Sequence, residues 1–114
     1  MILVDTHTHL YLEHFDDDRS EMINRAIDRG VKYMLIPNID SKSVDGMMQL
    51  CNDFPKNCFP MMGLHPCDVT KENFEEEIHH VENELKNFVQ VCPIEMLDKL
   101  DHPISLKELK SKSA

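Results

Sequence analysis

The 114-residue sequence lacks an excess of basic residues: it has 12 Lys and Arg against 21 Asp and Glu, for a formal net charge of −9. An acidic surface repels phosphate backbones, so this composition excludes a nucleic-acid binder that works through a basic patch. A metal-using enzyme that acts on phosphoesters is not excluded, because a bound cation can dominate the local electrostatic field.

The sequence also lacks a long apolar run and a C-x-x-C pair. No apolar segment approaches the ~20 residues that a membrane span needs, and Asp5 interrupts the apolar start, so we expect neither a membrane contact nor a signal peptide. Without C-x-x-C, the cysteines are expected to be reduced thiols of a cytoplasmic protein rather than a disulfide set. They are Cys51, Cys58, Cys67 and Cys92.

What the sequence does contain is a regular alternation of short apolar segments and amphipathic ones. The apolar segments, which we predict to be strands, are residues 2–4, 31–36, 58–62 and 88–94. Helices are predicted between them, with a last short one at 105–112. This order predicts a single α/β domain over residues 1–114, with a parallel sheet of three to four strands and alternating helices joined by right-handed crossovers.

Local signals refine the helix positions. Asp18 and Glu21 have the spacing of a capping box at the start of the first helix, and Gly30 suits the left-handed position after its end. The second helix is predicted to open at Asp40, and the third is predicted to be capped by Thr70. The second helix is predicted to point Val44, Met47, Met48 and Cys51 inward. In the third helix, the residues predicted to share one face are Phe74, Ile78, Val81 and Leu85.

The sharpest chemical feature is the segment Asp5-Thr6-His7-Thr8-His9, directly after the first predicted strand. In an extended backbone, residues two apart point to the same face, so His7 and His9 would present two imidazoles side by side. The carboxyl ends of strands are where α/β proteins place their sites, and two neutral imidazoles suit a borderline divalent ion. On spacing alone, metal binding and buried or incidental histidines both remain open.

The surrounding sequence resembles the start of the TatD-related deoxyribonuclease family. The resemblance is carried by the segments at 4–10, 15–19, 26–31, 36–38 and 63–66, which read VDTHTHL, FDDDR, AIDRGV, IPN and GLHP. These segments fall in the family's order and at its spacing from residue 3 to about residue 87. Asp-x-His-x-His also opens PHP-type phosphoesterases, but the segments at 15–19 and 63–66 look TatD-like.

The resemblance implies the first half of a (β/α)₈ barrel of the amidohydrolase kind, and a hydrolase that cleaves DNA phosphodiesters with one or two divalent ions (Mg, Mn or Zn). His7 and His9 match the family's first pair of metal ligands. Asp5 would orient the loop or an imidazole, unless it is only a strand-end carboxylate. His65, in the loop after the third strand, would be a pocket residue facing the same side, unless it is an ordinary loop histidine.

Beyond residue 91 the sequence departs from the family. The family carries a metal-bridging glutamate on its fourth strand, where an ungapped alignment places Ile94. Glu95 reaches that place only with a one-residue slip, which turns a strand side chain to the opposite face. Glu95 is therefore either a third metal ligand or a solvated carboxylate, and we regard residues 1–91 as family-like and 92–114 as a divergent tail.

A closed (β/α)₈ barrel needs roughly 200 residues or more, so we expect a partial barrel whose site is incomplete. No residue is a firm catalytic candidate, and a truncated chain would have little or no nuclease activity. The alternatives are a non-catalytic remnant or interaction module, which could self-associate through its open sheet edges, and a PHP-like phosphoesterase.

Overall fold

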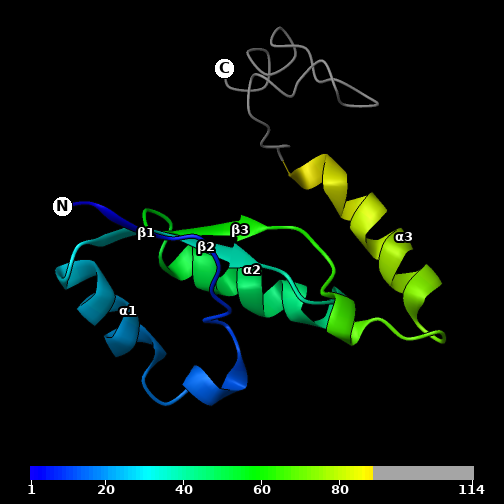
Figure 1. Cartoon of the computed structure of the whole chain (residues 1–114), viewed down its shortest axis with the longest axis horizontal. Helices are drawn as coiled ribbons and strands as arrows, with labels where there is room; N and C mark the ends of the chain where they lie inside the picture. The colour runs from blue at the N-terminus through cyan, green and yellow to red at the C-terminus, as the bar shows by residue number, and fades with distance from the viewer. Residues whose placement is uncertain (89–114) are drawn as a thin grey trace, which may run out of the picture.

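The computed structural model describes residues 1–88, in which three parallel strands form one sheet (Figure 1). The strands are β1 (Leu3–Asp5), β2 (Val31–Pro37) and β3 (Cys58–Met61), and β2 lies in the centre. The helices between and after them are α1 (Arg19–Asp28), α2 (Val44–Asp53) and α3 (Phe74–Glu84). This alternation confirms the predicted α/β class and matches the first half of a TIM-barrel-like fold. The predicted strand at 88–94 and helix at 105–112 fall on or beyond the limit of the described residues.

The parallel arrangement brings the carboxyl ends of all three strands to the same edge of the sheet. Val4 pairs with Tyr33 across β1 and β2, and Leu35 pairs with Phe59 across β2 and β3. The strands end at Asp5, at Pro37 and at Met61. The loops that follow these strands therefore start close together, as they do at the functional edge of α/β proteins.

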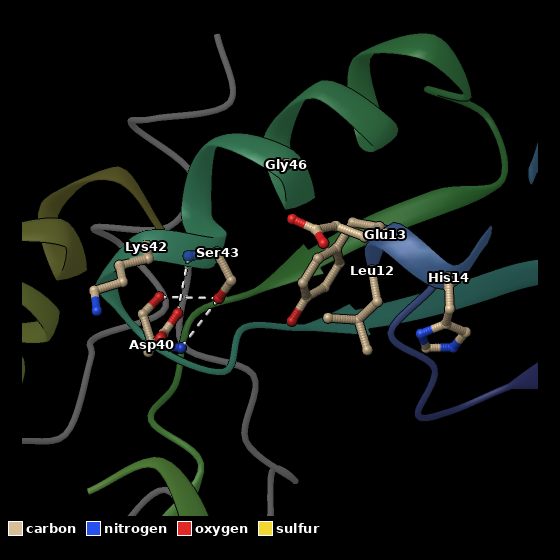
Figure 2. A pocket seen from close by; sticks show the side chains of 8 residues that line it. Leu12, Glu13, His14, Asp40, Lys42, Ser43 and Gly46 are labelled. Carbon is tan, nitrogen blue, oxygen red and sulfur yellow. Dashed lines mark hydrogen bonds between the residues drawn. The ribbon is translucent and has the colours of Figure 1, made fainter. Parts of the chain in front are cut away.

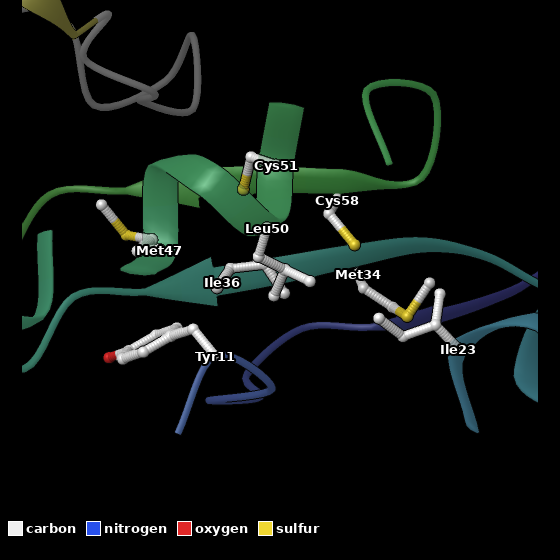
Figure 3. Close-up of a cluster of buried hydrophobic side chains, with 8 residues drawn as sticks. All are labelled: Tyr11, Ile23, Met34, Ile36, Met47, Leu50, Cys51 and Cys58. Carbon is white, nitrogen blue, oxygen red and sulfur yellow. The ribbon is translucent and has the colours of Figure 1, made fainter. Parts of the chain in front are cut away.

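The helices α1 and α2 pack on one face of the sheet. Side chains alternate along a strand, and Met34 and Ile36, which β2 sends to this face, are buried (Figure 3). They pack in one cluster with residues from the helices, from β3 and from the loop after β1: Tyr11, Ile23, Met47, Leu50, Cys51 and Cys58. On the other face Tyr33 and Phe59 are exposed and meet edge to face, with ring centroids 5.8 Å apart.

The helix starts differ in part from the predictions. Asp18 is the residue before α1, as predicted, but its carboxylate accepts a hydrogen bond from Arg25 at 3.3 Å and not from the helix backbone, so the capping box with Glu21 is wrong. A capping box does form at the second helical segment. There the Asp40 carboxylate accepts from the Ser43 backbone N–H, and the Ser43 hydroxyl accepts from the Asp40 N–H.

The turn after α1 follows the prediction. Gly30 has a φ of +98°, a conformation that residues with a Cβ rarely adopt. A Cβ on Gly30 would also lie 3.1 Å from the Met1 carbonyl oxygen. The glycine therefore allows the chain to turn sharply from α1 into β2, which then pairs with β1.

Two further predictions on the helices, one of an inward residue and one of a cap, need correction. In α2, Met47 and Cys51 are buried as predicted, but Met48 is exposed and Leu50 takes the inward position. The N-terminal cap of α3 is Asn73, and the Thr70 backbone N–H donates to its side chain at 2.7 Å.

Three residues of the predicted apolar stripe on α3 and just after it are exposed: Phe74, Ile78 and Leu85. The buried residue of the helix is Glu77, whose two carboxylate oxygens accept from the backbone N–H and hydroxyl of Ser41, both at 2.8 Å. A polar contact with the loop after β2 thus anchors α3, which explains why apolar periodicity did not locate its buried side.

Candidate metal centre

The loop that leaves β1 turns at once and presents two imidazoles. The backbone N–H of His7 donates to the carboxylate of Asp5 at 3.1 Å, which closes a tight turn at the strand end. The Nε2 atoms of His7 and His9 then face each other at 3.2 Å, with the rings nearly perpendicular. The predicted pairing of the two histidines is therefore present, and Asp5 lies where it can orient the loop.

The hydrogen bonds of His9 determine which of its ring nitrogens carries the proton. Its Nδ1 lies 3.0 Å from the carbonyl oxygen of Pro37, at the end of β2. A carbonyl can only accept, so Nδ1–H is the donor and the lone pair of the neutral ring is on Nε2. This is the arrangement that fixes a metal-ligating histidine, in which the second nitrogen donates to a backbone carbonyl.

Partial burial favours the neutral form of His9. Desolvation lowers the pKa of His9 below its ordinary value, and the nearby His7 and His65 imidazoles lower this pKa further. The hydrogen bond to Pro37 and the charge of Asp68 act in the opposite direction but do not reverse the shift. A ring that is neutral near pH 7 can offer its Nε2 lone pair without first losing a proton.

Two nitrogens 3.2 Å apart can share either a proton or a cation. With the His9 proton on Nδ1, the donor between the two rings would be His7 Nε2–H and the acceptor His9 Nε2. If both rings instead presented their Nε2 lone pairs to one divalent ion, His7 and His9 would hold that ion together.

His65 lies in the loop after β3 and approaches the pair. Its ring centroid is 6.3 Å from that of His9, which places it on the predicted side of the molecule. Its Nδ1 is engaged within its own loop, 3.2 Å from both the backbone N–H of Cys67 and the carboxylate of Asp68.

Residues 1–88 contain no group of three or more His, Cys, Asp or Glu side chains placed to hold a metal ion. Within this part of the chain, the imidazole pair offers two candidate ligands and no third side chain joins them. Glu95, the third candidate from the sequence, lies outside the described residues.

Arg19 lies in one of the family-like segments, but the sequence did not predict that it would hold the loop after His9. The guanidinium donates to three successive carbonyl oxygens of the loop after His9, at distances between 2.7 and 3.1 Å, and also to Asp16. The three carbonyls belong to Leu10, Tyr11 and Leu12. The Arg19 guanidinium thus holds the backbone that follows the imidazole pair. The one signal of this contact in the sequence is the presence of an arginine at the start of α1.

Asn38 has a comparable role at the end of β2. It is buried, its amide nitrogen donates to the carbonyls of Asp40 and Gly63 at 2.8 and 3.2 Å, and its amide oxygen accepts from the Ser43 hydroxyl at 2.8 Å. These bonds tie the loop after β2 to the loop after β3. They fix the Pro37 segment, whose carbonyl in turn orients His9.

A cavity of about 550 Å³ opens between the loop after β1 and the start of α2 (Figure 2). Its lining residues are Tyr11, Leu12, Glu13, His14, Asp40, Lys42, Ser43 and Gly46. The imidazole pair does not line it, so the cavity and the candidate metal ligands are separate features that share Tyr11 as a neighbour.

No helix within residues 1–88 is long and apolar enough to cross a membrane.

Known proteins resemble this chain in the same region that carries the imidazole pair. The family model for TatD related DNase matches residues 4–96. The "3'-5' ssDNA/RNA exonuclease TatD" of Pectobacterium parmentieri is 29% identical over 83 residues, covering 71% of this chain and 32% of that protein. The homologous exonuclease of Pectobacterium carotovorum is 30% identical over 81 residues, covering 69% of this chain and 31% of that protein.

A third relative, the "Uncharacterized metal-dependent hydrolase YabD" of Bacillus subtilis, is 30% identical over 67 residues, which cover 59% of this chain and 26% of that protein. The chain thus spans about a third of the length of the first two relatives. The family match covers more than half of the chain, including every residue of the candidate centre within the described part. The chain belongs to the TatD-related DNase family.

Proposed function

We propose that this chain carries one metal-binding half-site of a divalent-metal-dependent phosphodiesterase that acts on DNA. The single observation that supports this most is the facing of the His7 and His9 Nε2 atoms at 3.2 Å, at the carboxyl end of β1. The names of the relatives, which include nucleases and a metal-dependent hydrolase, support the same reaction class.

Each residue of the centre would have a distinct task. His7 and His9 would hold the ion through Nε2, and Asp5 would keep His7 in place through the turn that it closes. A bound divalent ion supplies a water of lowered pKa and neutralises charge on the phosphate. His65, 6.3 Å from His9 by ring centroids, would lie beside the bound phosphodiester as a pocket residue.

Two imidazoles are fewer ligands than a catalytic metal site uses, since catalytic zinc has three protein ligands. The described residues supply no third one. We therefore propose that the 114-residue chain binds an ion weakly and turns over DNA slowly or not at all. Glu95 is the candidate that the sequence offers for a third ligand.

The test combines metal titration with a cleavage assay. Calorimetric titration of the whole chain with Zn²⁺ and Mn²⁺ should show binding that falls at least about tenfold in His7→Ala and in His9→Ala. His14→Ala is the matched control, because His14 is an exposed histidine of the same loop and should leave binding unchanged. Glu95→Gln should weaken binding only if Glu95 completes the set.

Cleavage of labelled single-stranded DNA with Mg²⁺ or Mn²⁺ then separates the two parts of the proposal. Absent or slow cleavage is the expected result. Rapid cleavage that His7→Ala abolishes would disprove the incomplete site and keep the reaction class. Equal metal binding by the wild-type chain and both histidine variants would disprove the half-site itself, and hydrolysis of sugar phosphates without DNA cleavage would favour a PHP-like phosphoesterase.

A further inference from the structure

The imidazole of His9 has a second neighbour that its metal role alone does not explain. The Tyr11 hydroxyl lies 3.1 Å from His9 Nδ1 and 2.9 Å from the Pro37 carbonyl oxygen. The same carbonyl lies 3.0 Å from His9 Nδ1. Three polar atoms from two segments of the chain therefore form a closed triangle behind the imidazole, on the side away from His7.

The donors and acceptors of this triangle follow from the Pro37 carbonyl oxygen, which can only accept. The Tyr11 O–H donates to the Pro37 carbonyl, which can only accept. The phenolic oxygen then has lone pairs free on the side of His9, and it accepts from His9 Nδ1–H together with the carbonyl. Tyr11 is thus a second acceptor for the same proton, and it also fixes the position of the first acceptor.

The surroundings keep the Tyr11 side chain in this place. Tyr11 is only 8% exposed, and its backbone carbonyl accepts from the Arg19 guanidinium at 3.1 Å. Its side chain lies against α2 at Gly46, where a Cβ would be 3.8 and 3.9 Å from Tyr11 Cβ and Cδ2. Arg19 and α2 therefore hold Tyr11 from its backbone and from its ring.

We propose that Tyr11 is a positioning residue for His9: its hydroxyl keeps the proton of His9 on Nδ1 and holds the ring so that Nε2 faces His7. The consequence is a metal-binding lone pair that is already oriented before an ion arrives. This inference rests on the proposed metal function for its purpose, but the placement of the proton can be measured on the metal-free chain.

The test is Tyr11→Phe, which keeps the ring and its packing and removes only the hydroxyl. Tyr33→Phe is the matched control, because Tyr33 is an exposed tyrosine on the far face of the sheet. Long-range ¹H–¹⁵N NMR of the metal-free whole chain, with His9 assigned by comparison with His9→Gln, reports which ring nitrogen is protonated. Calorimetry with Zn²⁺ gives the affinity of each variant.

We expect His9 to be protonated on Nδ1 in the wild-type chain and in Tyr33→Phe, and to show a measurable share of the Nε2–H form in Tyr11→Phe. Zinc affinity should fall about tenfold in Tyr11→Phe, at the lower end of the range for residues that orient metal ligands. A folded Tyr11→Phe chain with wild-type His9 nitrogen shifts would overturn the proposal. Failure of the wild-type chain to bind zinc would instead disprove the proposed function, and the NMR comparison would still decide the role of Tyr11.

Discussion

The two faces of the sheet show how differently the same strands are used. On the face under α1 and α2, Met34, Ile36 and Cys58 are almost fully buried. On the opposite face, Tyr33 and Phe59 contact each other and remain more than a third exposed. Parallel sheets are usually covered on both faces. Within residues 1–88, however, the packing energy comes from the face under the helices, and the other face is apolar surface without a cover.

The largest expected difference between the faces is in stability. Met34→Ala should lower the free energy of unfolding by about 2–5 kcal/mol, because it removes a buried side chain and leaves a cavity. Tyr33 is the neighbour of Met34 in the sequence and lies on the opposite face. Tyr33→Ala should lower the free energy of unfolding by less than about 1.5 kcal/mol, since it removes one exposed aromatic contact. Urea denaturation of the two variants measures both, and equal losses would show that the second face is also packed.

The contrast between buried and exposed positions should also appear in the rates at which the thiols react. Burial raises the pKa of Cys51 to about 12 and that of Cys58 to about 11, whereas Cys67 is exposed in the loop after β3. At pH 8 iodoacetamide should therefore modify Cys67 at least about tenfold faster than the two core thiols, because only the thiolate reacts. Peptide mass spectrometry measures the rates, and urea-unfolded chain, in which the difference should vanish, is the control.

The direction of these shifts also fixes a pH dependence. A thiol whose pKa is raised in the folded chain holds its proton longer there than in the unfolded chain, so the folded state binds more protons above pH 9. The stability contributed by the protonated core thiols is complete below that pH and is lost as pH rises toward 11 to 12. Cys58→Ala should flatten this alkaline loss, and an unchanged slope would contradict the assignment.

The bare face offers a surface through which two copies of the chain could associate. Leu3 and Val4 are exposed in β1, which is an edge strand among the three described strands, and Phe59 adds an exposed aromatic ring. If the copies pair through this surface, Phe59→Ser should lower the mass measured by light scattering toward that of a monomer at equal concentration. Met48→Ser, exposed on α2, is the control. A wild-type chain that is monomeric at all concentrations would exclude this association.

The sequence located the elements better than it located their contacts. The alternation of apolar segments predicted three described strands and their parallel order, and the spacing of His7 and His9 predicted that their imidazoles would meet. These features are local, because they depend on side-chain alternation and on residues two apart. The buried side of α3 was not predicted, since it depends on Glu77 meeting Ser41 across 36 positions of sequence.

The supports of the imidazole pair were hidden for the same reason. Tyr11 and Arg19 act on the site through hydrogen bonds to backbone carbonyls. Every residue has a backbone carbonyl, so the residue types do not indicate where such bonds form. Pro37, which orients His9 from 28 positions away, contributes only its carbonyl oxygen. Sequence patterns therefore indicate candidate ligands, whereas the groups that orient them become visible only when the fold brings distant backbone together.

The smallest expected effect is that of a substitution in α2 next to Tyr11, where the packed face of the sheet meets the candidate metal centre. Gly46 lies in α2, and a Cβ there would meet Tyr11 at 3.8 Å or more, an ordinary contact distance. Gly46→Ala should therefore raise the free energy of unfolding by up to about 1 kcal/mol, because alanine favours the helix and the added methyl group strains nothing. Thermal denaturation and zinc titration of the same variant measure stability and affinity separately.

The comparison variant for Gly46→Ala is Gly30→Ala, where the sign should reverse. Gly30 has a positive φ and a Cβ there would lie 3.1 Å from the Met1 carbonyl oxygen, so this substitution should cost about 1–2 kcal/mol. Zinc affinity should stay unchanged in Gly46→Ala, because Tyr11 keeps its place. A stabilised Gly46→Ala chain that binds zinc less tightly would mean that the new methyl group displaces Tyr11, and the tolerance inferred from the 3.8 Å contact would then be wrong.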